Sequence, residues 1–123
     1  MKNMSLPKNK ELRELVQTLR RFAAKRDWDQ FHSPKNLSIA LSVEAAELME
    51  HFQWLTEPQS AKVKDRKLEA IEEEIGDVLL YLLRLSDKLG IDPALAARKK
   101  LKKNAIKYPV KKARGNAKKY TEL

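Results

Sequence analysis

Two pairs of carboxylates, each spaced three residues apart, are the residues of this chain best suited to chemistry. The first pair is Glu44 and Glu47, and the second is Glu74 and Asp77. Residues three apart share one face of a helix, so each pair would present its oxygens together. Carboxylates without histidine or cysteine suit a hard cation, Mg²⁺ or its substitute Mn²⁺. The spacing therefore predicts a divalent metal site, although such pairs also occur on solvated helix faces that bind nothing.

The apolar pattern around these acids favours the metal site over the solvated face. Glu44 falls between Leu41 and Leu48 on one apolar stripe, and Glu74 lies beside Val78 on another. A carboxylate on the buried side of a helix costs free energy unless something cationic compensates its charge. A bound divalent metal would supply that charge.

The elements that must position the acids are predicted to be helices. Gly and Pro are scarce, at three and five residues, while Ala, Leu, Lys and Glu abound, which favours helix over sheet. A length of 123 residues indicates one domain. The absence of cysteine excludes disulfides, thiolate metal sites and a cysteine nucleophile, and two histidines argue against a histidine-rich zinc site.

Apolar periodicity and capping residues predict a four-helix, all-α unit. The helices are expected at about residues 8–30, from Ser33-Pro34 to about 56–58, 63–89, and from Asp92-Pro93 to about 107. Gly90 is the expected stop of the third helix. Residues 1–123 are thus predicted to form a single domain, with a core at about 8–107 and an irregular basic C-terminal arm at 108–123.

No segment looks like a signal peptide, and none approaches the roughly 18 consecutive apolar residues of a membrane helix. We therefore expect a cytoplasmic protein that does not enter a membrane. The net charge of +9 is uneven, because residues 98–119 hold eleven lysines and arginines and no acid. Such a segment indicates an anionic partner, such as nucleic acid, an acidic surface or phosphate groups, or else a solvated basic tail.

Aromatic side chains could form the other half of a site. Trp28 and His32 lie in the loop before the second predicted helix, Trp54 lies near its end, and Tyr81 follows Asp77 by one turn. Flat rings beside a charged pocket can stack a nucleobase, which stabilises binding by roughly 1–3 kcal/mol per base. Tryptophans in small proteins are also common in cores and interfaces, so both interpretations stand.

Read together, these residues resemble the MazG-like nucleotide pyrophosphohydrolases of the all-α NTP pyrophosphatase superfamily, and within it the small dCTP pyrophosphatase subgroup. The resemblance covers about residues 10–123. The stretches that carry it are Arg26–His32, Val43–Trp54, Glu73–Val78 and Lys107–Leu123. A lone E-x-x-E is a weak signal, whereas this ordered set is specific.

The resemblance implies a role for each candidate residue. The implied Mg²⁺ ligands are Glu44, Glu47, Glu74 and Asp77. The implied catalytic residues are Glu47 and Glu44, with Glu47 or a metal-bound hydroxide as the alternatives for the base. The residues implied to line a nucleoside pocket are Trp28, His32, Trp54 and Tyr81. Those implied to hold phosphates at the end of the fourth helix are Lys100, Asn104 and Tyr108.

The activity implied by the resemblance is Mg²⁺-dependent cleavage of deoxynucleoside triphosphates to the monophosphate and pyrophosphate. A dCTP-like preference and a role in cleansing the nucleotide pool are expected. The family also implies a homo-oligomer, commonly a tetramer built as a dimer of dimers. An oligomer suits the sequence, because four helices cannot by themselves enclose a nucleotide, whereas an interface between copies can.

Three other interpretations remain open. The same chemistry could act on dUTP or broadly on dNTPs. Residues 98–119 could instead form a basic helical nucleic-acid-binding module, which is disfavoured because it leaves the four acids without a role. A purely structural helical oligomer would have no activity at all.

Overall fold

Helices make up all the regular secondary structure of residues 6–123, the part of the chain that the computed structural model describes. The all-α prediction is therefore confirmed over these residues, and residues 1–5 of the predicted domain lie outside them. No helix in the described part combines the length and apolar character that crossing a membrane requires. The α-helices are α1 (Lys10–Lys25), α2 (Pro34–Glu50), α3 (Glu57–Ser60), α4 (Asp65–Lys88), α5 (Pro93–Lys107) and α6 (Val110–Ala113).

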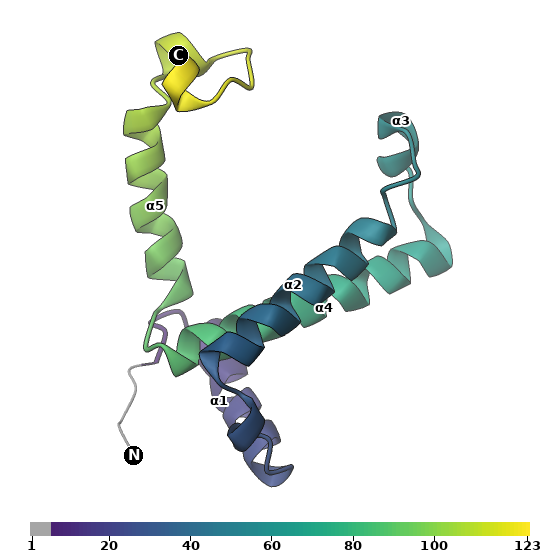
Figure 1. Cartoon of the computed structure of the whole chain (residues 1–123), viewed down its shortest axis with the longest axis vertical. Coiled ribbons are helices and arrows are strands. Elements are labelled where there is room, and N and C mark those ends of the chain that lie inside the picture. The colour runs from purple at the N-terminus through teal and green to yellow at the C-terminus, as the bar shows by residue number, and fades with distance from the viewer. Residues whose placement is uncertain (1–5) are drawn as a thin grey trace.

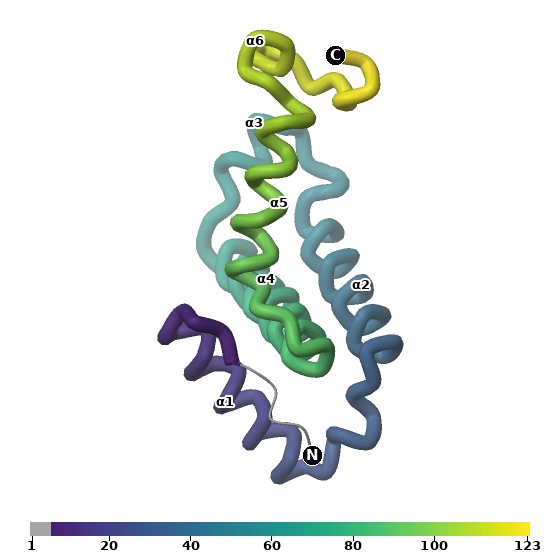
Figure 2. The backbone as a smooth tube through the Cα atoms, turned by 90° about the vertical axis from the view of Figure 1, so that its left-hand side faces the viewer, coloured from purple at the N-terminus to yellow at the C-terminus, as the bar shows by residue number. Residues whose placement is uncertain are grey.

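The central unit is the pair formed by α2 and α4, which run side by side in opposite directions (Figure 1). The loop that carries α3 joins them at one end. At the other end α1 packs against the C-terminal part of α4, as the tube in Figure 2 shows. The buried apolar side chains belong to these three helices: Val16 and Ala23 to α1, Leu37 to α2, and Ile71 and Leu83 to α4.

Local capping chemistry explains where these helices begin and end. The Ser33 hydroxyl accepts a hydrogen bond from the Asn36 amide at 3.1 Å, and a proline follows at the first helical position. The Asp92 carboxylate caps α5 in the same way. After α4, Gly90 adopts a φ of +69°, a left-handed conformation that glycine enters at little cost. These three predicted boundaries are confirmed.

Other boundaries differ from the prediction. Helix α1 ends at Lys25 instead of near residue 30, because Asp27 turns into the left-handed region at φ +52°. Helix α2 ends at Glu50 instead of near residues 56–58, and a separate short helix, α3, follows it. That short helix is held by a capping box, in which Thr56 and Gln59 exchange hydrogen bonds between side chain and backbone. A four-residue helix is too short to show an apolar period.

Helix α5 projects away from the α2–α4 pair, and the C-terminal arm folds back on its far end (Figure 1). The rings of Tyr108 and Tyr120 meet edge to face at 6.1 Å, and the Lys107 ammonium lies 4.9 Å from the centre of the Tyr120 ring. The arm is more ordered than predicted, since it contains α6 and a 3₁₀ turn at Tyr120–Glu122. Pro109 is the N-cap of α6, and the tyrosine contact joins the C-terminal turn to the end of α5.

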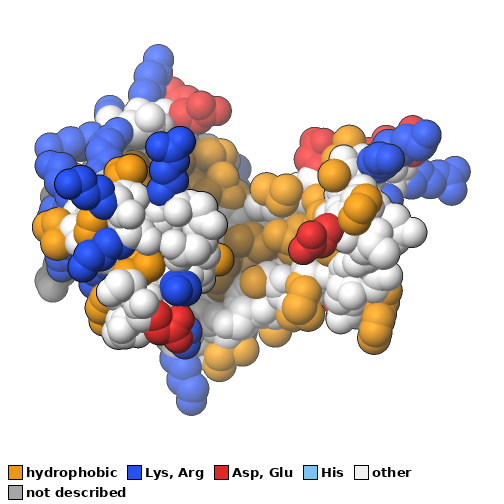
Figure 3. Space-filling view, turned by 90° about the horizontal axis from the view of Figure 1, so that it is seen from above, with side chains coloured by type: hydrophobic (Ala, Val, Ile, Leu, Met, Phe, Trp, Pro, Cys, Tyr) orange, Lys and Arg blue, Asp and Glu red, His pale blue; other side chains and the backbone are white. Residues whose placement is uncertain are grey.

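Large apolar side chains remain exposed along the helices. Ile75 on α4 is 53% exposed, and Ile106 on α5 is 80% exposed. Figure 3 shows apolar side chains in the hollow between the basic end of the molecule and the end that carries α3. Contiguous apolar surface of this kind usually marks an interface.

Candidate functional site

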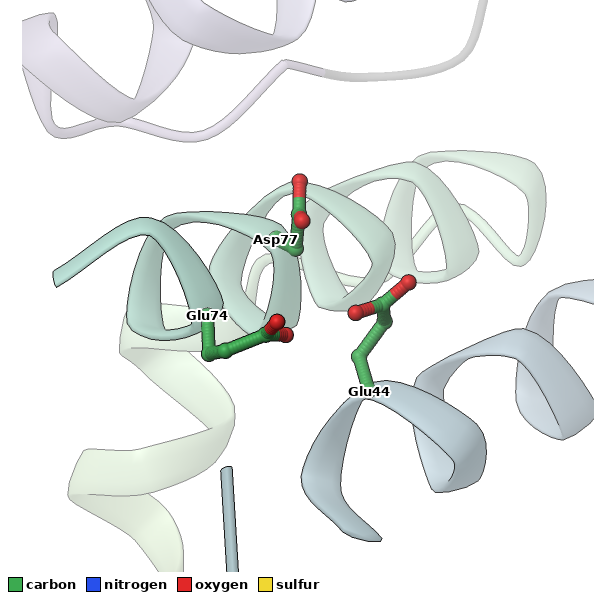
Figure 4. A group of neighbouring side chains, drawn as sticks. All are labelled: Glu44, Glu74 and Asp77. Atoms are coloured by element: carbon green, nitrogen blue, oxygen red, sulfur yellow. The ribbon is translucent and has the colours of Figure 1, made fainter. Parts of the chain in front are cut away.

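Three of the four predicted acids converge between α2 and α4 (Figure 4). Glu44 comes from α2, while Glu74 and Asp77 come from one face of α4. One carboxylate oxygen from each lies within 4.8 Å of the others. The cluster forms because the two helices lie side by side and because residues three apart on α4 face the same way. The three side chains are called the carboxylate cluster below.

The carboxylate cluster is electrostatically uncompensated. One oxygen of Glu44 and one of Glu74, Oε2 in each, are buried without a hydrogen-bond partner. Burial, followed by the adjacent carboxyls of Glu74 and Glu47, raises the pKa of Glu44 to about 7. None of the ion pairs between residues 6 and 123 involves these acids. Orphaned buried oxygens from several carboxylates fit a divalent cation that prefers oxygen ligands.

Glu47, the fourth predicted acid, lies one turn beyond Glu44 on α2. It is half-buried, and its carboxyl lies outside the group of oxygens within 4.8 Å. It is still close enough to Glu44 to raise the pKa of that residue. The structure therefore brings three acids together and leaves the fourth at their edge.

A cavity of about 210 Å³ adjoins the cluster and shares Asp77 with it. Three predicted pocket residues, Trp28, His32 and Tyr81, line this cavity. The rings of Trp28 and His32 meet edge to face at 6.1 Å. Pockets for small molecules usually measure about 300–1,000 Å³, so a single chain encloses only part of such a pocket. The remaining lining residues are Leu19, Phe22, Ala23, Leu80 and Arg84.

The other predicted binding residues lie outside this cavity. Trp54 follows α2 and is 86% exposed. Lys100, Asn104 and Tyr108 belong to α5 and its C-terminal cap, and α5 projects away from the α2–α4 pair (Figure 1). Within one chain the structure therefore does not bring these four residues to the carboxylate cluster.

Helix α5 nevertheless carries a face suited to anions. Lys100, Lys103 and Lys107 recur at three- and four-residue spacing and so share one side of the helix. The positive charges of Lys107 and then Lys103 lower the pKa of Lys100. Cations crowded in this way attract phosphate and other anions.

Sequence reasoning missed a group of charged residues beside the cavity. Arg84 on α4 lines the cavity and is only 5% exposed. It pairs with Asp29, and its Nε donates a hydrogen bond to Nδ1 of His32 at 3.1 Å. Asp87, one turn further along α4, pairs with Arg20 of α1 at 2.5 Å between Oδ1 and Nη2. The sequence offered one signal for this group. Arg84 and Asp87 carry opposite charges and lie three residues apart in the apolar-rich end of a long helix.

Comparison with known proteins gives three findings. The model of the MazG-like family matches residues 39–123. The dCTP pyrophosphatase 1 of Homo sapiens is 46% identical over 104 residues, which cover 83% of this chain and 61% of that protein. The dCTP pyrophosphatase 1 of Rattus norvegicus is 45% identical over 106 residues, with the same coverage. The chain thus spans about three fifths of the length of these curated relatives.

A solved structure is similar over more of its own length. The crystal structure of a pyrophosphatase from Archaeoglobus fulgidus matches this chain with a TM-score of 0.77 at 43% sequence identity. The match covers 82% of this chain and 94% of that one.

Proposed function

The chain belongs to the MazG-like family, and from this premise we propose that it is a metal-dependent nucleotide pyrophosphohydrolase that prefers dCTP. Relatives at 45–46% identity are named dCTP pyrophosphatase 1, and the structural neighbour is a pyrophosphatase. The observation that carries the proposal is the carboxylate cluster, with two orphaned oxygens, opening through Asp77 onto a cavity lined by aromatic rings.

The proposed reaction is hydrolysis of the bond between the α- and β-phosphates. A water oxygen adds to the α-phosphorus, the bond from that phosphorus to the bridging oxygen breaks, and pyrophosphate leaves the nucleoside monophosphate. Glu44, Glu74 and Asp77, with Glu47 at their edge, would hold Mg²⁺ or Mn²⁺. When bound, the metal offsets phosphate charge and lowers the pKa of water.

Residues of the chain supply the other roles in the reaction, which are proton transfer and binding of the nucleotide base. Glu47 lies beside the cluster and outside its closest group, so its carboxylate accepts the proton of the attacking water, with Glu44 as the second candidate. Trp28, His32 and Tyr81 surround the base in the cavity. This arrangement orients the substrate with its base away from the acids and its phosphates toward them.

A homo-oligomer would complete the site, and we propose a tetramer built as a dimer of dimers. The exposed apolar surface of α4 and α5 supports this assembly. A neighbouring copy would supply Trp54 to the base and Lys100, Asn104 and Tyr108 to the phosphates. The expected role is removal of unwanted dNTPs from the cytoplasmic nucleotide pool.

The test is pyrophosphate release from each dNTP, from dUTP and from the NTPs with Mg²⁺, with EDTA as the metal-free control. The variant Glu74→Gln should lower release at least roughly 100-fold, because it removes a carboxylate ligand from a half-buried cluster. The matched control is Glu72→Gln, an exposed acid two residues away on α4, which should retain wild-type activity.

The substrate panel separates the alternatives. Release that is strongest with dCTP supports the proposal in full. Equal release from all bases keeps the chemistry and removes the preference for dCTP. No release from any nucleotide by a folded, Mg²⁺-loaded protein would overturn the proposed function.

A further inference from the structure

Arg84 is a buried cation at the wall of the cavity, and its hydrogen-bonding nitrogens are engaged by protein groups. Nε donates to Nδ1 of His32, and Nη2 pairs with Asp29. A third nitrogen, Nη1, lies 3.8 Å from Oδ2 of Asp87. The guanidinium is therefore held from the loop on one side and from its own helix on the other.

The two acids that contact Arg84, Asp29 and Asp87, are themselves bound by other cationic side chains. Asp29 accepts a second hydrogen bond from the Lys88 ammonium at 3.0 Å, and this contact, followed by the charges of Arg84 and Lys88, lowers the pKa of Asp29. Asp87 is bound by Arg20 through two hydrogen bonds, at 2.5 and 2.8 Å. A bidentate pair of this kind has a defined geometry. The network therefore fixes the position of the Arg84 guanidinium.

The contact with Arg84 determines which nitrogen of His32 carries the proton. A guanidinium can only donate hydrogen bonds, so Nδ1 of His32 must be the acceptor. In a neutral imidazole the proton then sits on Nε2. Burial, followed by the positive charge of Arg84, lowers the pKa of His32 and favours this neutral form.

The resulting donor is unused by the protein. Among residues 6–123 no hydrogen bond forms at Nε2 of His32, although the ring lines the cavity. Trp28 meets the same ring edge to face. Because His32 lines the cavity, its Nε2–H donor is available to a bound molecule.

We propose that Arg84 is a positioning residue for base recognition: it holds His32 in the Nε2–H form, so that this donor binds the acceptor edge of a cytosine. The inference rests on the proposed function. N3 of cytosine is a hydrogen-bond acceptor, whereas N3 of uracil and thymine carries a hydrogen that would oppose the donor. O2 is an acceptor in all three bases, so it is a donor fixed at N3 that favours dCTP over dTTP and dUTP.

The first test observes the imidazole directly, without nucleotide. Long-range ¹H–¹⁵N correlation spectra report which ring nitrogen is protonated. The chain has two histidines, so a His51→Gln variant assigns the signals. We expect His32 of the wild type to be protonated at Nε2 alone. In Arg84→Met the two nitrogens should average toward a mixture of tautomers.

The second test measures selectivity between bases. In Arg84→Met the ratio of kcat/KM for dCTP to that for dTTP should fall about three- to tenfold, the effect expected of one hydrogen bond. The loss should lie in KM for dCTP, with kcat changed less than about twofold, because the phosphates are bound elsewhere.

The matched control is Arg21→Met. Arg21 is exposed on α1, donates a hydrogen bond to Thr18 of its own helix, and belongs neither to the ion-pair network nor to the cavity lining. This variant should leave the tautomer and the selectivity ratio as in the wild type. Arg84→Met should fold, because Asp29 keeps Lys88 and Asp87 keeps Arg20. If Arg84→Met does not fold, Asp29→Ala takes its place in both tests, because this variant releases the Arg84 guanidinium from an exposed partner.

Each outcome of these tests either supports or overturns the inference. A changed tautomer together with reduced selectivity supports the inference. An unchanged tautomer overturns it, and so does a changed tautomer with unchanged selectivity. If the wild type hydrolyses no nucleotide, the proposed function fails on its own. In that case two measurements on the wild type and Arg84→Met decide the role of Arg84. They are the tautomer of His32 and the calorimetric preference for binding dCMP over dTMP.

Discussion

Glu44 has the most strongly altered acid–base chemistry among the described residues of the site, and this makes metal binding pH-dependent. Its pKa of about 7, raised mainly by burial, means that it holds a proton at pH 6 that a cation must displace. The affinity for Mn²⁺ should therefore rise by up to about tenfold per pH unit below 7 and level off above it. Calorimetric titration at pH 5.5–8, in two buffers of different ionisation heat, measures both affinity and proton release.

The same pKa shift affects stability without metal. The unfolded chain loses this proton near the ordinary pKa of 4.5, while the folded chain keeps it to about 7. The contribution of Glu44 to the free energy of unfolding is thus fully present below pH 4.5 and is lost as pH rises through 7. Glu44→Gln should flatten the pH dependence of stability and of affinity. An Mn²⁺ affinity that is constant from pH 5.5 to 8 in the wild type would contradict this account.

Within α4, Gly76 is an exception to good helix chemistry. A glycine inside a helix costs on the order of 1 kcal/mol relative to alanine, and close approach by another group could explain it. A Cβ built at Gly76 meets nothing within 4 Å. Gly76→Ala should therefore raise the free energy of unfolding by about 0.5–1 kcal/mol in urea titrations. If the variant instead loses stability or assembly, a neighbouring copy must lie against this point of α4.

At the level of elements, local chemistry was readable from the sequence. Ser33 and Asp92 each precede a proline, and their side chains satisfy the free amides of the first turn, so helix starts follow from adjacent residues. The spacing of Glu74 and Asp77 likewise placed both on one face of α4. Helix α3 escaped prediction because its stability comes from a capping box and not from an apolar period.

Contacts between distant elements could not be read in this way. Arg84 reaches His32 across 52 residues and Asp29 across 55, and nothing in the spacing of the chain pairs them. The meeting of Glu44 with Glu74 required α2 to pack on α4, which the matched acid pairs only suggested. That Glu47 stands at the edge of the cluster depends on the register of those two helices, which the sequence does not specify.

For the whole molecule, the distance between α5 and the α2–α4 pair determines how a site can be assembled. In one chain the basic face of α5 and the carboxylate cluster lie on separate parts of the molecule (Figure 1). If Lys100 binds the triphosphate, it must do so at the cluster of another copy. Charge-assisted contacts to phosphate contribute about 1.5–3 kcal/mol each, so Lys100→Gln should lower activity roughly 10- to 100-fold.

Mixed oligomers test this arrangement. Glu74→Gln and Lys100→Gln chains, co-expressed with different tags and purified through both, should regain about a quarter of the wild-type activity, because about one shared site in four combines an intact cluster with an intact Lys100. Mixing Glu74→Gln with Glu44→Gln is the control and should restore nothing, since both changes damage the cluster within a single chain. Mixed oligomers of the first kind that stay as inactive as their parents would show that α5 serves its own chain, which would require α5 to swing onto the α2–α4 pair.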